Sequence, residues 1–200
     1  MKITAIKQQV KRHDRYSIFV DGAYTCSISE SGLIESHLAS GQELDEIQFA
    51  DLKRMAGADK AYGNALRYVA MRPRSEWELR DYFRRKQIDE GIASPIIERL
   101  RNVDLLNDLA FAKSWVESRR LLKSISKRRL ILELQQKRVP EDIIHKVLEM
   151  DTSDDRAQLQ VLIEKKRNRY PDDQKLMQYL ARQGFGYDEI KTALRAVEED

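Results

Sequence analysis

Apolar residues recur at helical spacing in three similar stretches of the chain. Each stretch begins at a helix-capping residue and places apolar residues four and eight positions later: Ser75 with Leu79 and Phe83, Ser126 with Leu130 and Leu134, and Asp172 with Leu176 and Leu180. The caps are 51 and 46 residues apart. Self-similarity at this period predicts stacked helical modules that bury their apolar faces against one another. Because stacked modules form an extended surface, the pattern favours a binding protein.

Each repeat reads as three short helices and closes with an apolar pair: Ile96/Leu100, Ile144/Leu148 and Ile190/Leu194. In the first repeat, Ser75 and Glu78 form the pattern of a capping box, and Ser94-Pro95 is expected to start the third helix. The cap-to-closing-Leu spacings are 25, 22 and 22 residues, which places about three extra residues near Glu90. We expect repeat boundaries at residues 57–106, 107–152 and 153–200.

Residues 1–56 read as a separate extension that contains strands. Asp21-Gly22 lies between two alternating segments and predicts a tight hairpin turn, because glycine accepts positive φ. Residues 3–10 indicate a third strand, and the residues in phase on the strand after the turn are Tyr24, Cys26 and Ile28. A short helix capped by Ser29 or Ser31 follows. A helix over about residues 45–55 comes next, separate from the array that begins near residue 60, and its expected buried stripe is Ile47, Leu52 and Met55.

The expected fold is mainly α: a tandem array of three three-helix, helix-turn-helix-like repeats after a small N-terminal extension with a β-hairpin. No apolar run approaches the roughly eighteen residues of a membrane span, and the chain does not begin with a secretory signal pattern. The single cysteine, Cys26, cannot form an internal disulfide, which favours the cytoplasm. Since stacked repeats bury one another, we expect a monomer.

Positive charge is concentrated in the second repeat. Residues 109–150 carry ten basic and five acidic residues, a net charge of +5, whereas residues 1–60 sum to −1 and residues 151–200 to −2. The eleven residues from 119 to 129 contain no acid and six cations: Arg119, Arg120, Lys123, Lys127, Arg128 and Arg129. With Lys137 and Arg138, which follow, they are candidates for contact with an acidic protein face or a polyanion. Neighbours on a helix point about 100° apart, so the cations cannot all face one way.

The residues that carry chemistry elsewhere do not form a catalytic or metal-binding pattern. Cys26 lies in phase with strand residues, which favours a buried side chain over a reactive thiol. The three histidines lack partners at metal-ligand spacing, and the acidic pairs lie at helix starts, where the helix dipole favours them. Phe111 and Trp115 stand at helical spacing typical of core packing rather than of a base-stacking platform. We therefore expect neither an enzyme nor a bound cofactor.

Three segments resemble the RecX family of recombinase regulators: residues 72–79 (RPRSEWEL), 106–112 (LNDLAFA) and 128–137 (RRLILELQQK). The resemblance implies a crescent-like stack of three-helix units that binds the RecA recombinase. It also implies inhibition of RecA filament growth, ATP hydrolysis and strand exchange, without catalysis by the chain itself. The sequence departs from the family pattern at Asn107, where an acid is usual, and after Lys86 and Lys137, where glycine is usual; only the third repeat keeps its glycine, Gly184.

A DNA-binding protein made of helix-turn-helix units is the alternative. In such units the N-terminus of the recognition helix approaches phosphates and base edges. Here the third helices of repeats two and three open with Glu141-Asp142 and Asp188-Glu189, which would repel phosphates. Sequence-specific reading of DNA is therefore disfavoured, while weak nonspecific DNA contact through the cationic residues stays open.

Overall fold

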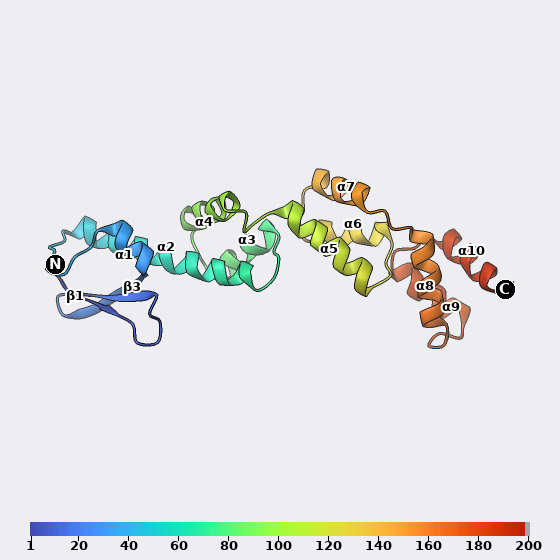
Figure 1. Ribbon diagram of the computed structural model, residues 1–200, viewed down its shortest axis with the longest axis horizontal. Helices are drawn as coiled ribbons and strands as arrows, with labels where there is room; N and C mark the ends of the chain where they lie inside the picture. The colour runs from blue at the N-terminus through green and yellow to red at the C-terminus, as the bar shows by residue number, and fades with distance from the viewer. Residues whose placement is uncertain (199–200) are drawn as a thin grey trace. The chain divides into compact units, whose positions relative to one another are not determined.

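The computed structural model describes residues 1–198 and divides into two compact units. Unit 1 contains Met1–Met71 and Tyr82–Asn102, and unit 2 contains Arg72–Asp81 and the chain from Val103 onward. Ten helices and one three-stranded sheet make up the described residues (Figure 1). The expected class, a mainly α array of three three-helix repeats behind a small β extension, is confirmed.

The N-terminal sheet is antiparallel in the order β1 (Ile3–Gln8), β2 (Arg15–Val20) and β3 (Ala23–Ser29). The predicted turn is present, with Asp21 at φ 48° and Gly22 at φ 83°. The predicted strand phase is wrong at one position. A register shift opposite Ile18 and Phe19 pairs Tyr24 with Phe19, and Tyr24 is 59% exposed. The irregular register breaks the simple alternation, so Tyr24 leaves the buried row that Ile28 keeps.

Helix α1 (Glu30–Ser36) is capped by Ser29, and helix α2 (Glu46–Ala70) is capped by Asp45 with a capping box to Gln48. The two helices expected on either side of residues 56–60 are a single helix, because no proline or capping sequence interrupts α2 there. The expected boundary after residue 56 falls inside α2. Ile47 is 76% exposed, which corrects its place in the stripe. The buried residues of α2 are Leu52, Ala56, Ala61, Ala65 and Val69.

The first repeat continues with α3 (Glu76–Arg85) and α4 (Glu90–Asn102). The expected start of α4 at Ser94-Pro95 is wrong. The N–H of Ala93 already donates to the carbonyl of Asp89 at 2.9 Å, and Pro95 lies inside the helix. Helix α4 has 13 residues, against 10 in the matching helix of repeat two, so the extra residues near Glu90 form one additional turn.

Repeat two consists of α5 (Asp108–Leu122), α6 (Lys127–Gln136) and α7 (Glu141–Met150). Repeat three consists of α8 (Asp155–Arg167), α9 (Asp173–Arg182) and α10 (Tyr187–Glu198). The predicted caps Ser126 and Asp172 accept hydrogen bonds from backbone N–H groups of their helices. The predicted stripe residues are 0% exposed: Leu130, Leu134, Leu176 and Leu180.

The middle helix of each repeat ends in the same left-handed turn. The residue after the cap has positive φ in all three, at Gln87 (54°), Arg138 (54°) and Gly184 (95°). In repeat two the N–H of Val139 donates to the carbonyl of Leu134 at 3.2 Å, which closes a Schellman motif. The two side-chain-bearing residues therefore adopt a conformation that glycine adopts at lower cost.

Candidate functional site

The same contact, between a serine hydroxyl and a backbone carbonyl, occurs at both joints between repeats within unit 2. At the first joint the hydroxyl of Ser75 donates to the carbonyl of Lys137 at 3.0 Å, and the N–H of Glu76 donates to Asp108 at 2.8 Å. At the second joint the hydroxyl of Ser126 donates to the carbonyl of Gln183 at 3.4 Å. The N–H after that serine, on Lys127, donates to Asp155 at 2.7 Å. A capping serine and the first-turn acid of the next repeat thus define each joint.

Buried charge reinforces the first joint. Glu78 is 7% exposed in its side chain and contacts Arg72 at 2.9 Å and Lys137 at 2.8 Å. Burial alone would raise the pKa of Glu78, but hydrogen bonds from these two cations and their charges outweigh it and lower the pKa to about 2. Lys137, a predicted contact residue, therefore holds α3 to repeat two.

A second charge network lies at the joint between repeats two and three. The guanidinium of Arg120 is 9% exposed, contacts Asp151 at 2.7 Å and Asp155 at 3.0 Å, and donates to the carbonyl of Ile125 at 2.5 Å. Burial raises the pKa of Asp151, but hydrogen bonds from Ser153 and Arg120 dominate and lower it below its ordinary value. Arg120, a member of the predicted contact set, is therefore paired with two carboxylates inside the unit.

Two further cations of the predicted set surround Glu133. Arg119 contacts Glu133 at 2.6 Å, and Arg129 contacts it at 3.5 Å. Trp115 donates its indole N–H to the same carboxylate at 3.0 Å, and the guanidinium of Arg119 lies 4.4 Å from the Trp115 ring centroid. Phe111 is buried in the core of repeat two, and Trp115 packs against that core, as the helical spacing predicts.

The remaining predicted cations are Lys123, Lys127, Arg128 and Arg138. Lys123, Arg128 and Arg138 are exposed, and Lys127 is half-buried. No ion pair between described residues involves any of these four side chains. They are the members of the predicted set that are available to a partner.

Lys123 lies at a groove of about 520 Å³ where α5 of repeat two meets α8 and α9 of repeat three. Its most exposed apolar lining residues are Leu121, 85% exposed, and Leu122, 72% exposed. Helix α8 contributes Lys165 and Lys166 to the same lining. We call the groove lined by Leu121, Leu122, Lys123, Lys165 and Lys166 the leucine–lysine groove. Exposed leucines beside lysines suit a partner surface that carries both apolar and acidic groups.

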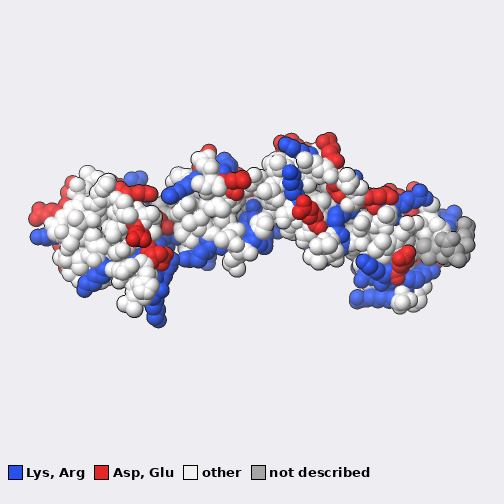
Figure 2. Space-filling view, viewed as in Figure 1, with Lys and Arg blue, Asp and Glu red and all other residues white. Residues whose placement is uncertain are grey.

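The lysines of α8 were missed in the sequence because repeat three is net negative. Lys165, Lys166 and Arg167 form the last turn of α8, where cations are usual because they complement the helix dipole. Figure 2 shows blue side chains gathered around the end of α8 and the turn to α9. The run of three cations was the available signal.

Among the side chains that the structure describes, no group of three or more His, Cys, Asp or Glu could hold a metal ion. Every buried side-chain nitrogen or oxygen in the described part of the chain has a hydrogen-bond partner. None of the described helices combines the length and apolarity that crossing a membrane requires.

Four models of the domains of one family match the chain in order. They are described as the Regulatory protein RecX N-terminal domain (residues 1–45) and the first, second and third three-helix domains of RecX (residues 61–100, 107–148 and 154–194). Together the matches span both units and all three repeats.

Full-length relatives and solved structures agree with these matches. The regulatory protein RecX of Bacillus pumilus is 31% identical over 200 residues, covering 96% of this chain and 76% of the relative. That of Listeria monocytogenes serovar 1/2a is 31% identical over 202 residues, covering 96% and 74%. A crystal structure of regulatory protein RecX aligns with a TM-score of 0.76 at 29% identity, covering 97% of this chain and 98% of that chain. RecX from Lactobacillus salivarius aligns with a TM-score of 0.61 at 29% identity, covering 72% and 98%. With the predicted repeats, their joints and these similarities in agreement, the chain belongs to the RecX family of regulatory proteins.

Proposed function

We propose that this chain regulates the RecA recombinase in the cytoplasm by binding the RecA filament, and that it inhibits filament growth, ATP hydrolysis and strand exchange. The RecX family supplies the regulatory role, and the leucine–lysine groove is the observation that supports a protein partner. Leu121 and Leu122 are exposed beside Lys123, although water disfavours a contiguous apolar patch. A protein face with acidic residues around an apolar centre would bury the leucines and pair with the lysines.

The joints explain how such a surface keeps its geometry. Buried ion pairs and backbone hydrogen bonds hold α3 to repeat two and repeat two to repeat three. Contact residues on neighbouring repeats are therefore held at fixed separations. A monomer with several linked contact points gains avidity on a partner that repeats along a filament. Occupation of the groove of the RecA filament would hinder the addition of further RecA protomers and block entry of the second DNA duplex.

The apolar half of the groove is tested by the double variant Leu121→Ser/Leu122→Ser. Both side chains are exposed, so the free energy of unfolding should change by no more than roughly 0.5 kcal/mol per site. We expect the variant to lose binding to RecA and inhibition of RecA ATP hydrolysis. The matched control is Val103→Ser/Leu105→Ser, which removes apolar side chains that are 54% and 53% exposed in the same unit.

The charged half of the groove is tested by Lys123→Glu, and the predicted cations outside its lining are tested by Lys127→Glu/Arg128→Glu. Binding is measured to RecA without DNA and to DNA without RecA, across salt concentration. We expect weaker binding to RecA even when DNA is absent. Wild-type binding and inhibition by both the leucine and the lysine variants would contradict the proposal. Loss of DNA binding alone would instead assign these residues to nonspecific DNA contact.

A further inference from the structure

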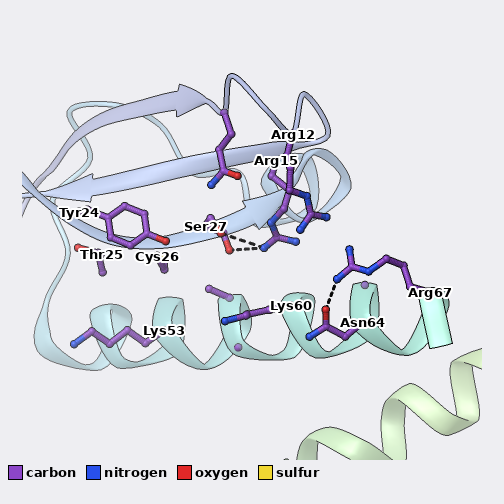
Figure 3. Close-up of a pocket in the computed structure, with 14 residues that line it drawn as sticks. Arg12, Arg15, Tyr24, Thr25, Cys26, Ser27, Lys53, Lys60, Asn64 and Arg67 are labelled. Carbon is purple, nitrogen blue, oxygen red and sulfur yellow. Dashed lines mark hydrogen bonds between the residues drawn. The ribbon is translucent and has the colours of Figure 1, made fainter. Parts of the chain in front are cut away.

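A second groove, of about 490 Å³, lies within unit 1 between strand β3 and helix α2. Figure 3 shows Arg12, Arg15 and Tyr24 on the sheet side of this groove and Lys53, Lys60 and Arg67 on the helix side. These five cations are accompanied by no acidic residue in the lining of the groove as the structure describes it. An acid-free cationic groove attracts polyanions.

The cations of the groove differ in their availability. Arg15 is buried, contacts Asp59 at 3.0 Å and donates to the carbonyl of Ser27 at 2.7 Å, so it builds the wall. Lys53, Lys60 and Arg67 are exposed, and no ion pair between described residues involves them. The Lys53 ammonium lies 4.2 Å from the Phe49 ring centroid and Arg67 donates to the amide oxygen of Asn64. Neither contact neutralises a positive charge, so all three cations can still attract an anionic ligand.

Their spacing along α2 is regular. Lys53, Lys60 and Arg67 follow one another at intervals of seven residues, which returns a helical side chain to nearly the same face. At 1.5 Å per residue they form a row roughly 21 Å long. A row of this length suits a ligand with repeated negative charges, such as a phosphodiester backbone, better than a single small anion.

The rest of the lining distinguishes a nucleic acid from an acidic protein. It contains no Leu, Ile, Val, Met, Phe or Trp, whereas protein interfaces have an apolar centre. Tyr24 is 59% exposed at the groove and offers a ring on which a base can stack. An exposed ring can stack on the unpaired bases of a single strand, whereas the bases of a duplex are already stacked on one another.

We propose that this groove binds single-stranded nucleic acid, with phosphates held by Lys53, Lys60 and Arg67 and a base stacked on Tyr24. The site is separate from the contact with RecA and does not rest on it. Residues 1–60 have a net charge of −1, yet their acidic residues lie outside the lining of the groove. A charge sum over this segment therefore conceals the site.

The test is fluorescence anisotropy of a labelled oligothymidylate of about 20 nucleotides, titrated with the full chain in the absence of RecA. Lys60→Glu/Arg67→Glu should weaken binding at least tenfold and reduce the log–log salt slope by about 1.4, or about 0.7 for each of two phosphates. The matched control is Lys2→Glu/Lys86→Glu, which changes the net charge equally at two exposed sites outside the groove. Equal losses in the two double variants would overturn the proposal, because they would show an effect of net charge alone.

Tyr24 gives an independent reading. Tyr24→Ala should weaken binding about five- to a hundredfold through loss of base stacking, whereas Tyr24→Phe should retain it. Unchanged binding of Tyr24→Ala would overturn the stacking contact. A duplex of the same length that binds more tightly, or polyglutamate that displaces the strand equally well at matched charge, would overturn the assignment to single-stranded nucleic acid. Circular dichroism confirms that each variant keeps its helices.

Discussion

Replacing Glu78 with glutamine should destabilise unit 2 strongly. Glutamine preserves the size of the side chain but cannot ionise, so Arg72 and Lys137 lose the charge that they surround. The drop in the pKa of Glu78 from 4.5 to about 2 corresponds to roughly 3 kcal/mol of stability at neutral pH. Because the Arg72 side chain is 43% exposed and recovers some hydration, we expect a loss of about 2–3 kcal/mol at pH 7.

The pH dependence provides the sharper test. The folded-state pKa of Glu78 lies below its unfolded value, so the stabilisation is present above the unfolded pKa and is lost as pH falls through the folded pKa. Linkage predicts about half of the neutral-pH effect at about pH 3, and little of it below about pH 2. The stability gap between wild type and Glu78→Gln should therefore narrow over this interval.

Urea unfolding followed by tryptophan fluorescence measures the effect. The chain has two tryptophans, Trp77 and Trp115, and both belong to unit 2. The ammonium of Lys137 lies 5.4 Å from the Trp115 ring centroid, so the signal reports on this joint. At pH 7 the midpoint should fall by about 1–2 M urea. The control Asp173→Asn removes an exposed ion pair in the same unit and should cost less than about 1 kcal/mol. A variant with the wild-type midpoint at pH 7, or a gap that stays constant down to pH 3, would refute the role assigned to Glu78.

Four other substitutions have expected outcomes in the same unfolding assay. Arg120→Ala should lower the free energy of unfolding by about 3–5 kcal/mol, because two carboxylates at the joint lose their shared cation. A loss well below this range would contradict the stabilising role of these ion pairs. Leu134→Ala should cost about 2–5 kcal/mol, since its side chain is 0% exposed, and a cost near zero would contradict the core of repeat two. Arg138→Gly should raise stability by up to about 1 kcal/mol through relief of positive φ. Gly184→Ala should lower stability, because the added methyl combines positive φ with contact against the capping serine of α6, and a neutral result would show that the joint can open.

Several features that depend on residues close together in sequence were predicted correctly. The caps at Ser126 and Asp172 and the stripe through Leu130 and Leu134 follow from one helix and its neighbours in sequence, and all are present. The single α2 was missed because the end of one predicted helix and the start of the next have no breaker between them, and a pattern cannot show that the chain runs on.

The sites depend on contacts that the sequence does not reveal. Arg120 reads as one more cation of a basic run, and only the fold brings Asp151 and Asp155 to it from the next repeat. The groove of unit 1 joins Tyr24 to Lys60 across two elements, so no stretch of sequence shows it as a unit. Counting charge by segment concealed both features.

The joint between repeats has a consequence for how such a chain can evolve. Each joint uses a capping serine hydroxyl, a backbone carbonyl at the end of a middle helix, and an acid that opens the next first helix. The backbone carbonyl is supplied by any middle helix, whereas the hydroxyl requires a serine or threonine cap, and the cap of α9 is Asp172. A duplicate of repeat two, which carries the serine hydroxyl, the carbonyl and the acid, would find matching atoms on both sides if it were inserted between two other repeats. The array can therefore grow by whole repeats through gene duplication, while the exposed side chains of each copy diverge toward new partners.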